Sequence, residues 1–197
     1  MQDVESGWLS QAQKGDSQAF AQLVEAYQKP VYNLCYRMLH NAEDAEDAAQ
    51  ETFLRAYRSM NRYDANRSFS TWLLSIAAHY CIDQIRKRRM TIVSIEDLPI
   101  PVLPDDAIGP ESTVSRSEEN RRIKALLEVL DPIDRVAVIM YYWYDFSYKE
   151  ICQTLSLTQS ALKSRLHRAR RAMAQEWMER QTQALSPGRR LHESSTV

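Results

Sequence analysis

Apolar residues recur at helical spacing in several separate stretches of this 197-residue chain, and runs that alternate apolar with polar residues are scarce. The first long stretch spans 20–39, and Asp16 stands where it can cap the helix start. We expect Pro30 to kink this helix or to end its first part, because proline removes a backbone donor. The apolar stripe of this helix consists of Leu23, Tyr27, Leu34 and Met38.

Two further helices are predicted in the first half of the chain. The segment 41–60 carries acidic residues in its first half and arginines in its second, an order that complements the helix dipole. A polar turn at 61–68 leads into a helix over 71–89, which has core-like apolar residues first and a cluster of bases last. The rings of Phe69 and Trp72 precede that cluster, as in sites for single-stranded nucleic acid. A solvated helix end is the alternative interpretation.

Residues 91–117 lack helical periodicity, and four prolines lie among them. Five acidic residues precede the first basic one, so the segment is acidic. We interpret it as a linker between a domain at 1–90 and a domain at 118–180, with a polar tail at 181–197. The predicted fold is therefore all-α, with two small helical domains joined by an extended acidic linker.

The second domain is predicted to hold four helices, of which the last two form a helix-turn-helix. Asp131, followed by proline, is placed to cap one helix, and Ser147 with Glu150 forms a capping-box pattern at the next. Thr158 is placed to cap the last helix. Between 151 and 175 there are five lysines and arginines and no carboxylate, although the whole chain has a formal charge of −1.

A basic helix held against a partner helix by a tight turn is the physical form of a DNA major-groove reader. Ile151, Leu162 and Leu166 supply the apolar contact between the two helices. The outward side chains carry hydroxyl, amide and cationic groups, which bond base edges and phosphates. They are Gln159, Ser160, Lys163, Ser164, His167, Arg168 and Arg171. The alternative is a merely solvated basic helix, which the capped turn and the lack of acids disfavour.

Composition narrows the function classes. Cys35, Cys81 and Cys152 are far apart, a spacing that fits neither a zinc site nor a disulfide framework. Apolar runs fall far short of the roughly 20 residues that cross a bilayer, and the acidic, polar start is no secretory signal. We find no nucleophile set, phosphate-binding glycine loop or cofactor fingerprint. We therefore expect a cytoplasmic protein with no metal, cofactor or catalytic activity, whose acidic helix at 41–60 is solvated or docks a protein.

The chain resembles the extracytoplasmic-function (ECF) group of the sigma-70 family of bacterial transcription initiation factors. Sigma region 2 is similar to 19–89, through DAEDAAQETFLRAYR at 44–58 and FSTWLLSIAAHYCIDQIRKRR at 69–89. Sigma region 4 is similar to 123–174, through FSYKEICQTLSLTQSALKSRLHRARRAM at 146–173. The two motif sets surround an acidic linker, and we expect neither region 1.1 nor region 3, which is the ECF pattern.

This resemblance implies roles for three groups of residues. The clamp helices of the polymerase largest subunit would bind Asp44, Asp47, Gln50, Glu51 and Phe53. An unstacked base of the −10 element would bind Phe69, Thr71, Trp72, His79 and Asp83, with Arg86, Lys87 and Arg88 on the adjacent backbone. The −35 element would meet Lys163, Ser164, Arg165 and Arg168, joined by the outward Ser160, His167 and Arg171.

The partners that the resemblance implies are core RNA polymerase, promoter DNA and an anti-sigma factor that holds the protein inactive. On the polymerase, the contacts are the clamp helices and the flap of the second-largest subunit, and the linker would enter the RNA exit path and mimic the transcript. The chain departs from the family at three positions. Family members often carry asparagine at His79, glycine at Ser156 and a β-branched residue at Leu162.

The expected function is that of a sigma factor that binds core polymerase, recognises the −35 and −10 elements and promotes promoter melting. A stand-alone helix-turn-helix regulator of duplex operators is the second hypothesis, with 1–90 as a sensor or dimerisation module. An interaction protein such as an anti-sigma adaptor is the third. The acidic helix and the aromatic-basic helix of the first domain disfavour the second, and the basic recognition helix disfavours the third.

Overall fold

The computed structural model describes residues 2–93 and 114–185, and within these ranges all regular structure is helical. The first group of elements is α1 (Gln2–Gln13), α2 (Ser17–Leu39), α3 (Ala42–Ser59), the short 3₁₀ helix η1 (Met60–Arg62) and α4 (Phe69–Val93). The second group is α5 (Val114–Glu128), α6 (Pro132–Trp143), α7 (Tyr148–Leu155) and α8 (Gln159–Leu185). The all-α prediction is confirmed. Most of the predicted linker, and the tail from residue 186, lie outside the described residues.

Short polar side chains begin the helices where the sequence predicted. An Asp16 carboxylate oxygen accepts bonds from the backbone N–H groups of Gln18 and Ala19, at 2.8 and 3.1 Å. Asn41 caps α3 in the same way. Pro30 does not end the first part of α2, because the helix continues through it for nine more residues, to Leu39.

Three helix boundaries differ from the prediction. The polar N-terminal segment forms α1, which the apolar pattern did not predict, and this helix buries Ala12 against the rest of the chain. Helix α4 extends to Val93, and α5 already begins at Val114, so both enter the segment that was predicted as linker.

On α3 the apolar residues divide between two faces. Ala45, Ala48 and Ala56 are fully buried against the neighbouring helices, whereas Leu54 is 50% exposed and Tyr57 is 47% exposed. At 100° per residue, Leu54 lies roughly opposite the alanine stripe. Leu54 and Tyr57 therefore do not belong to the buried stripe of α3. Small alanines let α2 approach α3 closely, and larger side chains are left outside.

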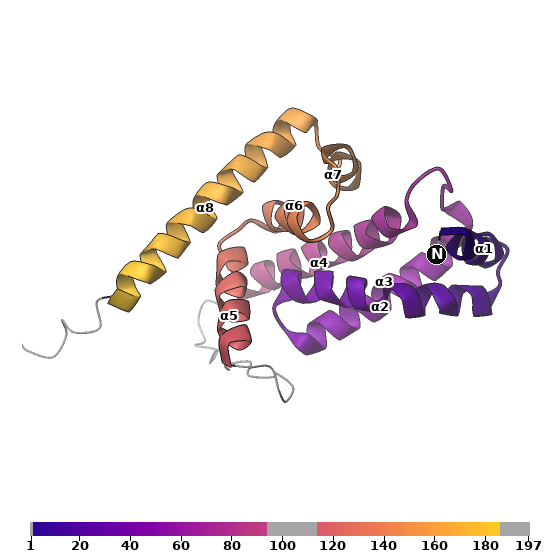
Figure 1. Cartoon of the computed structure of the whole chain (residues 1–197), viewed down its shortest axis with the longest axis horizontal. Helices are drawn as coiled ribbons and strands as arrows, with labels where there is room; N and C mark the ends of the chain where they lie inside the picture. The colour runs from indigo at the N-terminus through magenta and orange to yellow at the C-terminus, as the bar shows by residue number, and fades with distance from the viewer. Residues whose placement is uncertain (1, 94–113, 186–197) are drawn as a thin grey trace, which may run out of the picture.

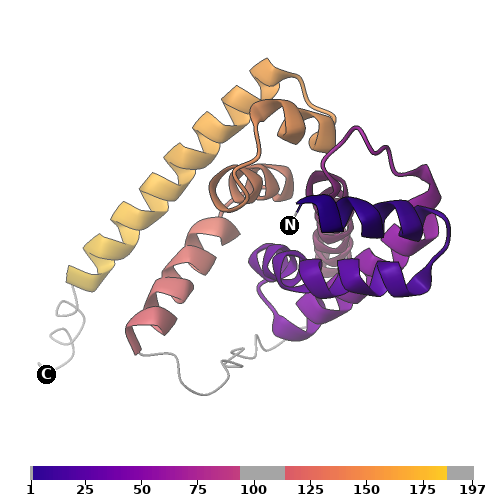
Figure 2. The same ribbon diagram turned by 45° about the vertical axis from the view of Figure 1, so that its right-hand side comes forward.

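The two groups of helices pack against each other (Figures 1 and 2). Helices α6 and α7 contact α4, and α5 and α6 contact α2. Helix α8 lies on the side of α6 that faces away from the first group, as both views show. The buried apolar residues form one cluster that runs through both groups, from Leu73 of α4 to Ile139 of α6.

Candidate nucleic-acid interface

Helices α7 and α8 form the predicted helix-turn-helix, and local bonds hold its turn. The Ser147 N–H donates to Glu150 Oε2 at 2.9 Å, and the Glu150 N–H donates back to Ser147 Oγ at 3.3 Å, which completes the predicted capping box. Ser156 ends α7 in the left-handed conformation, at φ 53°, which is the geometry that explains the family's preference for glycine there. Thr158 Oγ1 accepts from the Ala161 N–H at 3.2 Å and starts α8.

The first turns of α8 present most of the predicted −35 residues to solvent. Leu162, Leu166 and Ala169 are buried against the neighbouring helices, so the opposite face points outward. The exposed side chains on this face are Ser160, Lys163, Ser164, His167, Arg168 and Arg171. Hydroxyl, imidazole and cationic groups on one helical face are suited to both phosphates and base edges.

Arg165 is placed differently from the other predicted −35 residues. Its guanidinium donates to Asp134 of α6 at 2.6 Å, and the two side chains are only 27% and 12% exposed. This ion pair ties α8 to α6. In this arrangement the side chain serves the packing of the helix pair, and its role as a DNA contact stays a prediction.

Helix α4 carries the predicted −10 residues in three different environments. Phe69 is 4% exposed, with its ring centroid 5.2 Å from that of Tyr27 and 5.5 Å from that of Tyr63. Trp72 is half-buried beside this cluster, 5.1 Å from Tyr63. His79 is exposed, with Nδ1 2.7 Å from the Ser75 carbonyl oxygen. Phe69 therefore supports the ring of Trp72 from inside, whereas Trp72 and His79 reach the surface.

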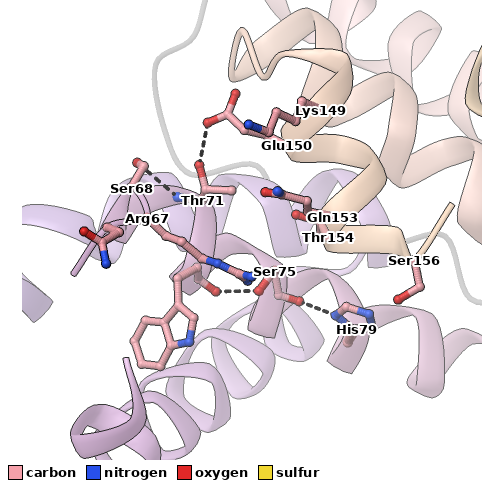
Figure 3. Close-up of a pocket in the computed structure, with 12 residues that line it drawn as sticks. Arg67, Ser68, Thr71, Ser75, His79, Lys149, Glu150, Gln153, Thr154 and Ser156 are labelled. Carbon is pink, nitrogen blue, oxygen red and sulfur yellow. Dashed lines mark hydrogen bonds between the residues drawn. The ribbon is translucent and has the colours of Figure 1, made fainter. Parts of the chain in front are cut away.

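A cleft of about 420 Å³ lies between α4 and α7 and contains the accessible −10 candidates (Figure 3). Thr71, Trp72 and His79 line it from α4. Across the cleft, Glu150 of α7 accepts a hydrogen bond from the Thr71 hydroxyl at 2.9 Å. The hydroxyl of Ser147 lowers the pKa of Glu150, and the bond from Thr71 adds to this effect, so the carboxylate is ionised at neutral pH. The ionised Glu150 carboxylate thus holds the Thr71 hydroxyl, which would otherwise be free to face nucleic acid.

The end of α4 is exposed and basic, and it approaches the acidic start of α3. Asp83, Arg86, Lys87 and Arg88 are all exposed. Arg88 forms an ion pair with Asp44, which is one of the predicted polymerase-binding residues. The pair brings the candidate DNA-backbone surface and the candidate polymerase surface to one edge of the first group of helices.

The rest of the predicted polymerase surface lies on α3. Asp47 and Gln50 are exposed, Glu51 pairs with Arg55 at 2.7 Å, and Phe53 is half-buried. The exposed Leu54 and Tyr57 follow on the same helix. They give an acidic face an apolar end, which is a feature of protein-binding surfaces. The sequence indicates that Leu54 and Tyr57 are exposed, since neither residue falls on the buried stripe of alanines on α3.

Four contacts join the two groups of helices along the second half of α2 and at its C-cap, and the sequence indicated none of them. Arg135 is 6% exposed and donates to the Met38 carbonyl at 2.6 Å. The other three contacts are from Lys124 Nζ to the His40 carbonyl at 3.1 Å, from the Tyr144 hydroxyl to the Pro30 carbonyl at 2.6 Å, and from the Arg37 guanidinium over the Trp143 ring at 5.1 Å. Arg135 and Lys124 also bring two positive charges to the carbonyl end of α2, where the helix dipole is negative.

His40 lies at this junction and is 9% exposed. It ends α2 in the left-handed conformation, at φ 61°. Burial, together with the positive charges of Arg135 and Lys124, lowers its pKa to about 3. The imidazole is therefore neutral when the two groups of helices are packed together.

Within the ranges 2–93 and 114–185, no group of three or more His, Cys, Asp or Glu residues is arranged to hold a metal ion. No helix in these ranges has the length and apolar character needed to span a membrane.

Comparison with known proteins decides the family. The Sigma-70 region 2 model matches residues 23–91, and the Sigma-70 region 4 model matches residues 120–173. The ECF RNA polymerase sigma factor SigW of Bacillus subtilis (strain 168) is 36% identical over 175 residues, which cover 85% of this chain and 94% of SigW. The chain is a member of the ECF sigma factors. SigE of Mycolicibacterium smegmatis is 34% identical over 77% of this chain and 59% of its own length.

Two solved structures of sigma factors share the fold. CnrH, in complex with the cytosolic domain of CnrY, aligns with a TM-score of 0.64 at 22% identity and covers 87% of this chain and 95% of CnrH. RpoE of Bartonella quintana, in complex with the anti-sigma factor NepR, aligns with a TM-score of 0.65 at 20% identity and covers 81% of this chain and 96% of RpoE. The expected family and function are confirmed: the protein is an alternative RNA polymerase sigma factor. The hypothesis of a stand-alone regulator is not favoured, because region 2 occupies the part that would have to be its sensor.

Proposed function

We propose that this ECF sigma factor reads the −35 duplex with the exposed face of α8 and captures unstacked −10 bases at the cleft beside α4. We further propose that it docks on core polymerase through α3. The observation that carries the proposal is the pairing of two unlike surfaces in one chain. One is a cationic, hydroxyl-rich helical face, and the other is a cleft with an aromatic ring and a basic track next to it. Duplex and melted DNA require these two kinds of surface, respectively.

Promoter recognition in this proposal requires the two groups of helices to separate. The −35 and −10 elements are separate stretches of the promoter, and the duplex between them rises about 3.4 Å per base pair. In the packed arrangement, Glu150 of the helix-turn-helix contacts Thr71 of the cleft directly, at 2.9 Å. Because this contact holds α7 against the cleft, we infer that the helix-turn-helix leaves the cleft when both elements are bound. Separation would also release the Thr71 hydroxyl and open the cleft.

Melting follows from the same proposal. A base that leaves the duplex and stacks on Trp72 stabilises the open strand, so binding energy is converted into strand separation. The chain has no catalytic activity of its own in this scheme, and it acts in the cytoplasm, where RNA polymerase works. We assign the neighbouring backbone contacts to the basic end of α4, at Arg86, Lys87 and Arg88.

We also propose control by an anti-sigma factor. The support is the structural neighbour RpoE, which was solved in complex with the anti-sigma factor NepR. A partner that favours the packed arrangement would keep α7 against the cleft. The ratio of its affinities for the packed and separated arrangements would determine how much of the protein is active.

Run-off transcription tests the whole proposal. Core polymerase is assayed with and without this protein on a library of genomic promoter fragments, and the expected result is a set of transcripts that depend on the protein. Transcripts that do not depend on it, together with tight operator binding by the protein alone, would instead identify a stand-alone regulator.

A further inference from the structure

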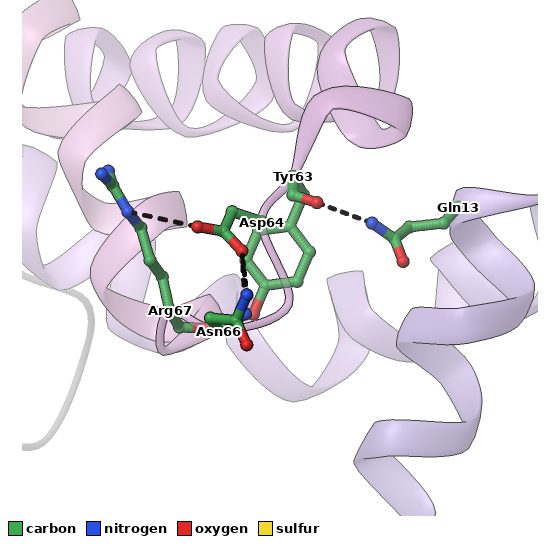
Figure 4. Close-up of polar contacts among 5 residues, drawn as sticks. All are labelled: Gln13, Tyr63, Asp64, Asn66 and Arg67. Carbon is green, nitrogen blue, oxygen red and sulfur yellow. Dashed lines mark hydrogen bonds and ion pairs between the residues drawn. The ribbon is translucent and has the colours of Figure 1, made fainter.

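Helix α1 lies outside the residues that the region 2 model matches, which begin at residue 23, yet two long-range hydrogen bonds tie it to that region. Gln13 Nε2 donates to the Tyr63 carbonyl oxygen at 2.7 Å, across 50 positions of sequence (Figure 4). The Tyr27 hydroxyl donates to Glu5 at 2.5 Å. Burial, and then this bond to the carboxylate, raises the pKa of Tyr27, so the donor is retained at physiological pH.

Both bonds lead into the aromatic cluster beneath the cleft. The Tyr27 ring packs edge-on against Phe69, at a centroid distance of 5.2 Å. The Tyr63 ring lies 5.5 Å from Phe69 and 5.1 Å from Trp72. Tyr63 therefore connects α1, through its carbonyl group, with the ring of Trp72, which lines the cleft.

Tyr63 also holds the loop that leads into α4. Its hydroxyl donates to the Arg67 carbonyl at 2.5 Å, which closes the loop on itself. Within the loop, an Asp64 carboxylate oxygen accepts from the backbone N–H and the side-chain amide of Asn66, both at 3.0 Å. Figure 4 shows Gln13, Tyr63 and this loop together. Asn66 and Arg67 are exposed and line one end of the cleft.

We propose that α1 positions the −10 cleft, and that Gln13 is its positioning residue. Gln13 fixes the Tyr63 backbone at the point where η1 ends, and the Tyr63 side chain fixes both Trp72 and the loop. A cleft ordered in advance binds an unstacked base without the entropic cost of ordering side chains on binding. The inference rests on the proposed −10 capture, and it adds to that function a segment that lies outside the family match.

The test uses holoenzyme with full-length protein and measures the rate of open-complex formation through permanganate reactivity of melted thymines. The promoter is one that responds to the wild type in the run-off assay. Gln13→Glu keeps the side-chain shape, removes the donor and places a negative charge against the carbonyl. Gln11→Glu is the matched control, because it adds the same charge to an exposed position of the same helix. We expect Gln13→Glu to slow opening about five- to tenfold relative to Gln11→Glu. Equal rates overturn the proposal.

A second variant separates positioning from folding. Gln13→Lys keeps a donor of similar reach, and we expect it to open the promoter within about twofold of the wild-type rate. If Gln13→Lys and Gln13→Glu lose activity equally, the hydrogen bond to Tyr63 is not the cause and the proposal fails. A loss of −35 duplex binding and melting temperature in proportion to the loss of opening would also overturn it, because it would show general destabilisation.

Failure of the underlying function gives a different result. If Trp72→Ala opens the promoter at the wild-type rate, the −10 assignment of the cleft fails, whatever Gln13 does. If Trp72→Ala slows opening while Gln13→Glu matches Gln11→Glu, only the inference about α1 fails.

Discussion

The two candidate DNA surfaces of this sigma factor differ in what presents them. On α8, a capped turn and one apolar stripe suffice to point Lys163 and Arg168 outward. At the cleft beside α4, Trp72 is held by an aromatic cluster, and Thr71 is bonded to a helix from the other end of the chain. The first surface is exposed in the packed arrangement, whereas α7 borders the second and Glu150 holds its Thr71 hydroxyl.

In the proposed mechanism, packing between the two groups of helices would therefore control −10 capture, while it leaves the outward face of α8 accessible. An apolar cluster runs through both groups, and the polar contacts between them end largely on backbone carbonyls of α2 and its C-cap. Such contacts are lost as a set when the groups separate, because water then solvates the carbonyls. Substitutions at the contacts between the groups and on each surface can separate the effect of packing from that of DNA binding.

Arg135→Ala is expected to have the largest effect. Arg135 donates to the carbonyls of Met38 and Glu128, at 2.6 and 3.2 Å, and its loss leaves buried acceptors unpaired. We expect the free energy of unfolding in urea to fall by about 3 kcal/mol. The distance between fluorophores on α2 and α8 should increase as well. Arg165→Ala is the control, since its ion pair lies within the second group of helices. An unchanged distance in Arg135→Ala would show that this residue does not hold the groups together.

Trp72→Ala tests the cleft beside α4. Stacking of a base on an aromatic ring contributes about 2 kcal/mol, so open complexes should become roughly 30-fold rarer. Closed-complex binding should change little, because the −35 face is untouched. Permanganate footprints and duplex-binding assays measure the two steps. Equal losses in both would mean that Trp72 contributes only to core packing.

Arg168→Ala tests the accessible surface. We expect −35 duplex binding to weaken by about 1.5 kcal/mol, with relaxed preference at one base pair. Binding to a panel of single-base −35 variants, titrated at fixed salt, measures this. If every sequence in the panel loses the same affinity, Arg168 contacts phosphate and does not read a base.

The smallest effect concerns pH. Burial beside Arg135 and Lys124 lowers the pKa of His40 to about 3 in the packed arrangement, and exposure on separation returns it toward its ordinary value of 6.5. The neutral imidazole therefore favours packing, fully above about pH 6.5 and less as the pH falls below it. Between pH 7.5 and 5.5 we expect packing to weaken by roughly 1 kcal/mol. The fluorophore distance followed against pH measures this, and His40→Asn, which tolerates the left-handed backbone, should abolish the dependence.

Much of the fold could be predicted because its signals are local. The caps at Asp16, Ser147 and Thr158 and the apolar periodicity of α2 and α7–α8 each act within one or two turns, and the structure contains them all. Helix α1 escaped prediction because its sequence is mostly polar and its stability depends on docking against Tyr27 and Tyr63. The burial of Phe69 and the ion pair of Arg165 could not be predicted either, since sequence periodicity does not show which partner covers a helix face.

By itself, the sequence determined the helices other than α1, the turn of the helix-turn-helix, the outward basic face of α8 and membership of the sigma family. These depend on backbone capping and on side chains a few residues apart. The tertiary structure alone decided that Glu150 meets Thr71, that Arg135 reaches the end of α2 and that Gln13 reaches Tyr63. Each of these contacts joins residues at least 50 positions apart. They form only when the helix faces have packed together, because the chain between the partners does not constrain their distance.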